Sequence, residues 1–262
     1  VDFYGVDLGV MQDELDALAP KPPAAFDRRL YSAALGHAAL MIDANSQDPD
    51  CGGGGEPPCQ LDRVGPAGFF FPASGLRGNS LGFVQSPRYG HAAWNIDWGP
   101  FVPPVPPGMQ DGRPHRNGVM SVPDAIATLD MTNVGIAAVA TSGDLGPLVV
   151  VANHANANTA FADLYDRFLV GTVWQDLDGD AFYDAGEGRS GVLVSTDGSA
   201  RFAVTSPGGG YAVPVLAAGA MQVTFSGGGL PTYVADVTVG ADSVLVDYEV
   251  PEPGALASGA IA

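Results

Sequence analysis

The chain has 262 residues and a formal net charge of -18, and this length suits one large domain or two of ordinary size. Its 11 Lys and Arg residues face 29 Asp and Glu residues, so it lacks the clustered basic side chains that nucleic acid or anionic lipid requires. We therefore expect no nucleic-acid partner. No apolar run reaches the roughly twenty residues of a spanning helix, and we expect no membrane span in this chain.

The two cysteines point to an oxidising compartment. Cys51 and Cys59 flank the short Gly-rich segment GGGGEPP, which is flexible enough to close, so we predict a disulfide between them. Two free buried thiols are the alternative, and they fit a polar, Gly-rich segment less well. The chain begins at Val1 without Met, which we interpret as a mature or trimmed form. The predicted localisation is extracellular or at the cell surface.

The first half contains the helical patterns. Residues 26–44 place four side chains on one stripe at helical spacing, namely Leu30, Ala34, His37 and Met41. Residues 69–79 are predicted to be irregular, and a second helix is predicted to open at Ser86, which can cap it, with proline following. Residues 133–140 and 147–153 are predicted to form a hairpin with a longer loop. Helices followed by paired strands indicate an α+β layered domain.

The second half has a different pattern from Leu169 onward. Seven short alternating runs are separated by Gly, Pro, Asp and Ser, and they cover residues 169–175, 191–196, 201–205, 211–216, 220–225, 234–239 and 244–250. This spacing predicts an all-β seven-stranded sandwich. The predicted organisation of the α+β chain is thus a first domain over 1–153, a linker over 154–168, a sandwich over 169–250 and a tail over 251–262.

An acidic segment between the first two of these runs predicts a metal site. Counting from Asp176, carboxylates occupy positions 1, 3, 5, 9 and 12 of a twelve-residue loop, as Asp176, Asp178, Asp180, Asp184 and Glu187. The backbone carbonyl of Phe182, at position 7, would be a further ligand. Five carboxylates in so short a loop repel one another, and a hard divalent cation would let them converge. We predict calcium, because magnesium demands a tighter octahedron; a solvated acidic turn is the alternative.

Two departures place this loop outside the helix-loop-helix calcium proteins. Position 6 is Ala181, where such a loop has glycine, and the preceding residues LVGTVWQ have the pattern of a strand. The prediction is therefore a calcium loop between strands.

The first half resembles the bacterial form of the CAP superfamily, the secreted domains related to cysteine-rich secretory proteins. The resemblance runs from about Tyr4 to Asn153 and rests on the order of four segments: PKPPAAFDRRLYSAALGHAALM, DRVGPAGF, RPHRNGVMS and TNVGIAAV. It implies a secreted CAP-like domain of layered α/β/α architecture.

The same resemblance implies a degenerate cleft. His115 in RPHRN matches one histidine of the family's metal-holding cleft. However, NSQ, ending at Gln47, replaces an expected Ser-His pair, and Gly78 of RGN replaces an expected glutamate. One histidine is too few for a zinc site or for acid/base catalysis. Asp97 is a hypothetical neighbour of His115, and His154 is interpreted as part of a polar linker. We therefore expect no enzyme.

The second half resembles the B-type repeat domains of Gram-positive surface adhesins, with GTVWQDLDGDAFYDAGEGRSGVLV and SPGGGY carrying the match. The resemblance covers roughly 169–250, and it implies a rigid spacer or stalk stabilised by calcium. The tail resembles the start of a Pro-Glu-Pro C-terminal sorting signal at Pro251, Glu252 and Pro253.

Together these patterns predict a secreted structural or adhesive protein of the cell surface or extracellular matrix. Its CAP-like domain would be carried on a calcium-rigidified sandwich, with self-association or surface polysaccharide as the partner, and it could assemble into a layer or fibre. Two alternatives stay open: a metal-dependent hydrolase using His115, and a lipid or glycan binder. For the latter, the triple phenylalanine over 69–71 would form a lipid-facing patch, although three such residues beside a core more often pack into it.

Overall fold

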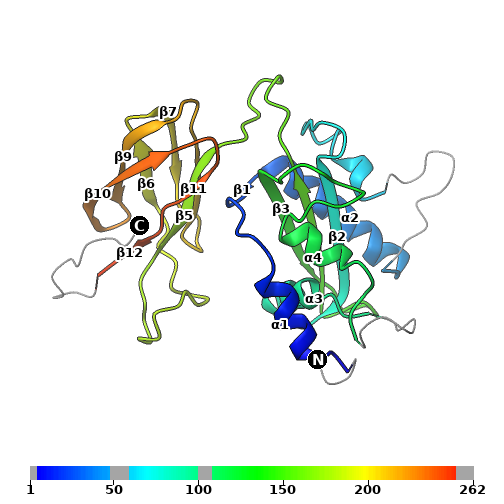
Figure 1. Ribbon diagram of the computed structural model, residues 1–262. Helices are drawn as coiled ribbons and strands as arrows, with labels where there is room; N and C mark the ends of the chain where they lie inside the picture. The colour runs from blue at the N-terminus through cyan, green and yellow to red at the C-terminus, as the bar shows by residue number, and fades with distance from the viewer. Residues whose placement is uncertain (1–4, 48–58, 100–107, 252–262) are drawn as a thin grey trace. The chain divides into compact units, whose positions relative to one another are not determined.

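The computed structural model describes residues 5–47, 59–99 and 108–251. The chain divides into two compact units: the first comprises Val1–Lys21 and Asp27–Leu164, and the second Pro22–Phe26 and Tyr165–Ala262. The first unit contains helices and a sheet, whereas the second contains strands (Figure 1). The predicted α+β fold class is confirmed. No helix of the described ranges is long and apolar enough to cross a membrane.

The helices of the first unit are α1 (Leu8–Asp16), α2 (Arg28–Ala44), α3 (Pro87–Ile96), α4 (Pro114–Val119) and the short 3₁₀ helix η2 (Leu61–Arg63). The side chain of Asp27 caps α2 by accepting the N–H of Arg29 at 2.8 Å. Ser86 caps α3 by accepting the N–H of Tyr89 at 3.1 Å, as predicted. Sequence patterns did not indicate α1.

The sheet of the first unit has β4 (Leu148–Ala155) at its centre, antiparallel to both β3 (Asn133–Ala140) and β2 (Leu76–Val84). The predicted hairpin of β3 and β4 is confirmed. The expectation of an irregular segment over 69–79 is wrong from Leu76 onward, because β2 begins there and pairs with β4.

The sheet is covered on both faces, which gives the layered arrangement expected of the first unit. On one face, α2 packs against a cluster that includes Ala137, Val149 and Val151. The approach is so close that a Cβ on Gly135 would lie 2.0 Å from the backbone nitrogen of Tyr31. On the other face, α3 contributes Trp94 to a cluster whose remaining buried members are Val84, Val150 and Ala152.

The strands that form the two sheets of the second unit are β5 (Phe168–Trp174), β6 (Val192–Thr196), β7 (Ser199–Val204), β8 (Gly210–Pro214), β9 (Gly219–Gly227), β10 (Leu230–Val239), β11 (Val244–Leu245) and β12 (Tyr248–Glu249). The short strand β1 (Ala25–Phe26) instead lies at the edge of the sheet with the order β1-β3-β4-β2. One sheet has the order β10-β9-β6-β7, and in the other β5 lies between β8 and the parallel strands β11 and β12. Side chains of both sheets share one buried cluster, which includes Val173, Val194, Val213 and Phe225. The second unit is thus a β-sandwich.

One predicted strand, over 244–250, is divided in two. Between β11 and β12, the carboxylate of Asp247 accepts the N–H of Thr172 at 2.7 Å, where a regular ladder would use a backbone carbonyl. The backbone also passes so close that a Cβ on Gly171 would lie 2.1 Å from the carbonyl oxygen of Val246. Glycine on β5 therefore permits this close, interrupted pairing.

Candidate metal site

The acidic loop, residues 176–187, connects β5 to β6 and is closed at its base by backbone pairing. The N–H of Gln175 donates to the carbonyl of Glu187 at 3.0 Å, and the N–H of Arg189 donates to that of Val173 at 2.7 Å. Tyr183 anchors the middle of the loop: its ring meets Trp174 edge-on at 6.1 Å, and its hydroxyl donates to a backbone carbonyl at 3.0 Å. The loop is thus fixed at three points to the sandwich.

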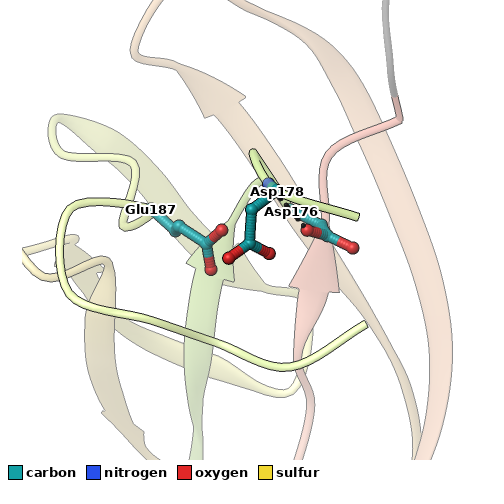
Figure 2. A group of neighbouring side chains, drawn as sticks. All are labelled: Asp176, Asp178 and Glu187. Atoms are coloured by element: carbon teal, nitrogen blue, oxygen red, sulfur yellow. Dashed lines mark hydrogen bonds between the residues drawn. The ribbon is translucent and has the colours of Figure 1, made fainter. Parts of the chain in front are cut away.

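The loop brings its five carboxylates into two overlapping groups, each able to hold a metal ion with ligand atoms within 4.8 Å of one another. The first group is Asp176, Asp178 and Glu187; the second is Asp178, Asp180 and Asp184. Figure 2 shows the carboxylates of Asp178 and Glu187 directed toward one another, with Asp176 beside them. Asp178 is common to both groups, so a cation held by either one contacts it.

Backbone N–H groups already hold part of this arrangement. Asp176 accepts the N–H of Gly179 at 2.7 Å and that of Ala181 at 2.9 Å. Glu187 is only 4% exposed, and its two oxygens accept backbone N–H groups from both ends of the loop, at 2.8 Å and 2.7 Å. Glu187 is therefore a fixed, buried ligand candidate at the foot of an otherwise exposed loop.

Ala181 has the backbone conformation that a calcium loop needs at its sixth position. Its φ is +64°, in the left-handed region that usually favours glycine. The departure noted in the sequence is therefore one of residue type and not of backbone conformation. Because a non-glycine residue adopts this conformation at a cost, the surrounding hydrogen bonds have to hold it there.

Electrostatics within the loop favour a cation. The N–H groups of Ala181 and Gly179 lower the pKa of Asp176. The N–H of Asp180 lowers the pKa of Asp178, but loss of hydration and the charges of the neighbouring carboxylates outweigh it, so the net shift is upward. The negative charges of the neighbouring carboxylates thus make ionisation of Asp178 unfavourable, and a bound cation would offset this repulsion.

The donor set fits a hard divalent cation. All five side chains offer carboxylate oxygens, which suit calcium or magnesium better than the softer metals that prefer nitrogen and sulfur. Phe182 donates its N–H to Asp180 at 2.8 Å and has a side chain that is 73% exposed. The ligand role of its carbonyl stays a prediction.

Two predicted features lie outside the described residues. Cys51 is among residues 48–58, so its pairing with Cys59 stays a prediction. Glu252 and Pro253 of the predicted sorting signal lie in 252–262 and are likewise not described.

A second polar site involves His115 in the first unit. Its Nδ1 lies 2.8 Å from Oδ1 of Asp97, whose side chain is buried and whose other oxygen accepts the backbone N–H groups of His115 and Arg116 at 2.8 Å and 3.1 Å. The hypothesis that Asp97 neighbours His115 is confirmed. Asp97 closes α3 in the left-handed conformation, with φ at +60°, and this turn directs its carboxylate to the start of α4.

The expectation that His154 belongs to a polar linker is wrong. His154 lies within β4, directly opposite Arg77 of β2, and is 6% exposed. Its Nε2 is buried without a hydrogen-bond partner in the part of the chain that the structure describes. Burial, followed by the charges of Arg77 and His91, lowers the pKa of His154 to about 4. This histidine is therefore neutral at physiological pH.

Comparisons with known proteins add little to this geometry. No protein-family model and no curated protein matches the chain. Two solved complexes of type II cohesin with X-dockerin from Acetivibrio cellulolyticus, both interface mutants, align at 24% and 18% identity over 31% of this chain, each with a TM-score of 0.26. A protein from Bacteroides uniformis described as carbohydrate-binding aligns at 18% identity over 33% of this chain, with a TM-score of 0.25.

The alignments span 52% of the two cohesin–dockerin chains and 41% of the Bacteroides chain. TM-scores this low mark distant likeness and carry no functional argument. The resemblances to the CAP superfamily and to adhesin repeats therefore stay predictions from the sequence.

Proposed function

We propose that the chain is a non-enzymatic extracellular structural or adhesive protein whose β-sandwich is rigidified by calcium in the acidic loop. The observation that carries this proposal is the convergence of five carboxylates on one loop that is anchored to both β5 and β6. Calcium bound there would cancel the repulsion between them and lock the connection between the two sheets of the sandwich. A stiff module of this kind suits a spacer or scaffold that carries the first unit.

The proposed partner is a second copy of the chain or a surface polysaccharide. The net charge of -18 opposes close approach of copies in the absence of cations. Millimolar calcium would reduce that repulsion, so calcium would control assembly as well as stiffness. Any salt screens the net charge, but only an ion bound in the acidic loop also fixes the loop's conformation, so this mechanism predicts that assembly depends on calcium and not on salt in general.

Light scattering and negative-stain microscopy of the purified chain test this prediction. We expect ordered assemblies in millimolar calcium that dissolve in excess chelator, and no such assemblies when magnesium replaces calcium. A chain that stays monomeric at high concentration in calcium would contradict self-association. Co-sedimentation with insoluble polysaccharide in calcium would then decide whether polysaccharide is the partner.

The Asp97–His115 pair favours a second candidate, a hydrolase-like or ligand-binding function in the first unit. A buried carboxylate that holds one ring nitrogen of histidine orients the other nitrogen as a base or metal ligand. The side chain of His115 is 30% exposed, so a ligand could reach it.

Substitution of His115 tests this second candidate. If the pair is catalytic, His115→Ala should lower hydrolysis of a panel of ester and peptide substrates by at least about 100-fold, the usual contribution of a general base. His91→Ala, at an exposed histidine of α3, is the matched control. Equal rates in the wild type and both variants, at the level of the buffer reaction, would exclude the hydrolase and leave the structural function.

A further inference from the structure

Helix α1 is attached to the first unit in an unusual way, because none of its residues is buried. A nine-residue helix is only marginally stable by itself in water. Its apolar side chains Val10, Met11 and Leu15 are only half-buried, so polar contacts have to add to their packing, and the strongest of these come from Glu14. Both ends of the segment are tethered nearby, by the buried Val6 before the helix and by the ion pair of Lys21 with Asp130 at 2.5 Å after it.

Glu14 binds two arginines that lie 99 and 102 residues away in the chain. Arg113 grips its carboxylate with two nitrogens, Nε to Oε2 at 3.0 Å and Nη2 to Oε1 at 2.8 Å. Nη1 of Arg116 donates to Oε2 at 2.5 Å. Hydrogen bonds and charge from both arginines outweigh the effect of burial and lower the pKa of Glu14. This is the forked geometry by which guanidinium groups recognise planar carboxylates.

The arginine pair, Arg113 and Arg116, is positioned by contacts other than Glu14. Arg116 donates Nε to the carbonyl of Asn95 at 2.5 Å and Nη2 to that of Ile96 at 3.1 Å. Arg113 donates Nη1 to the carbonyl of Gln110 and has a φ of +50°, a strained conformation for a residue with a side chain. The two guanidinium groups would therefore remain aimed at the same point if Glu14 left.

The two arginines are more buried than Glu14, as expected if Glu14 can be replaced by another carboxylate. The side chains of Arg113 and Arg116 are 11% and 3% exposed, whereas that of Glu14 is 33% exposed. The cations thus belong to the body of the unit, and the anion belongs to a surface helix. Loss of α1 would leave two adjacent positive charges, held by backbone carbonyls, without this partner, and this favours uptake of another anion.

We propose that the arginine pair is a binding site for a carboxylate-bearing ligand, and that α1 occupies it with its own Glu14 until such a ligand displaces the helix. The ligand carboxylate would take the forked contacts of Glu14, beside the Asp97–His115 pair. Uronic acids of an acidic polysaccharide and acidic side chains of a peptide share this chemistry. The site lies in the first unit and does not depend on the calcium function proposed for the second.

The contact of Glu14 with the arginine pair determines how tightly a ligand carboxylate has to bind in order to displace it. A group tethered by short flexible segments acts at an effective concentration on the order of millimolar. A free carboxylate would therefore bind the wild type weakly, and removing the charge of Glu14 should reveal the intrinsic affinity of the arginine pair.

The test compares Glu14→Gln with Asp13→Asn, which removes one charge from an exposed position of the same helix. Two probes are titrated at low salt by calorimetry, oligogalacturonate and a short oligoglutamate peptide. We expect at least one of them to bind Glu14→Gln at least about tenfold more tightly than it binds the wild type or Asp13→Asn. Binding of only one probe would support the site and identify its source of carboxylate.

A second substitution shows whether the gain comes from the arginine pair. Adding Arg113→Gln to Glu14→Gln should abolish it, and Arg113→Lys, which keeps the charge without the fork, should retain only part of it. Hydrogen exchange should show faster exchange of the α1 amides in Glu14→Gln than in Asp13→Asn. Equal probe affinity in all chains, a gain that survives Arg113→Gln, or unchanged protection of α1 would each overturn the proposal.

Discussion

Removal of calcium is expected to lower the melting temperature of the second unit by roughly 10–20 °C. A ligand that binds only the folded state at a hundredfold excess over its Kd contributes about 2.7 kcal/mol, and each kcal/mol shifts the melting of a unit of about 100 residues by about 4–8 °C. The first unit has no part in the acidic loop, so its transition should not move. Calorimetric scans in millimolar calcium and in excess chelator measure both transitions in one sample.

Asp178→Asn should separate calcium binding from the stability of the metal-free loop. Asp178 belongs to both carboxylate groups, yet its own acceptor contact with the loop backbone is a long one, to the N–H of Asp180 at 3.3 Å. Because neighbouring charges raise the pKa of Asp178, removing its charge relieves repulsion when no cation is present. We expect the variant to melt no lower than the wild type in chelator and to lose most of the calcium-induced rise.

Asp242→Asn is the matched control for this experiment, since Asp242 is an exposed aspartate of the same unit outside the loop. It should keep the full response to calcium. If the wild type, Asp178→Asn and Asp242→Asn all melt identically with and without calcium, the loop is a solvated acidic turn. A response to magnesium equal to that to calcium would instead argue against calcium as the specific ion.

The acidic loop could be predicted because its chemistry is local in sequence. All its carboxylates lie between Asp176 and Glu187, and their spacing follows directly from the chain. The sandwich strands could be predicted for a similar reason, since alternation over a few residues records which side chains face a core. The sequence could not show that Ala181 takes a left-handed conformation, because several hydrogen bonds of the folded loop hold it there.

Strand β2 was not predicted because its glycines are required by close contacts with residues that are distant in the sequence. A Cβ on Gly78 would lie 2.7 Å from the side chain of Gln60, and one on Gly82 would lie 3.1 Å from Leu145. In the sequence these glycines look like loop residues, whereas in the fold they allow close packing over a strand. Local sequence patterns likewise could not predict the contact between Glu14 and the arginine pair, because it joins residues about a hundred positions apart.

His154 is the residue for which the sequence and the fold differ most, and its burial has a measurable consequence. In the unfolded chain its pKa would be near 6.5, whereas in the folded chain it is about 4. Between these two values the unfolded state binds more protons than the folded state, so the first unit should lose stability as the pH falls. The loss should begin near pH 6.5 and reach about 3 kcal/mol by pH 4.

His154→Gln should remove the contribution of His154 to this pH dependence, because glutamine does not titrate; His37, whose pKa burial and the charge of Arg63 also lower, keeps its own contribution. The variant is expected to start less stable at pH 7.5, where neutral histidine fits the site, and to converge with the wild type as the pH falls to 4. His91→Gln, at an exposed histidine whose charge is the smallest of the three causes that lower the pKa of His154, should keep most of the wild-type slope. Denaturant unfolding at pH 7.5, 5.5 and 4 measures the free energy of unfolding of the three chains.

Asp124, whose pKa Arg77 lowers most strongly, loses its own stabilising contribution only below about pH 4 and so falls outside this window.

Titration of the wild type by NMR measures the pKa of His154 directly, without a substitution. The ring proton signals of His154 should stay those of a neutral imidazole down to about pH 5 and shift only near pH 4. A midpoint near 6.5 would mean that the ring is hydrated in solution, and the slope attributed to its burial would then have to come from other groups. A midpoint near 4 would establish an uncharged imidazole within β4, paired across the sheet with the buried cation of Arg77 and kept neutral by the fold around it.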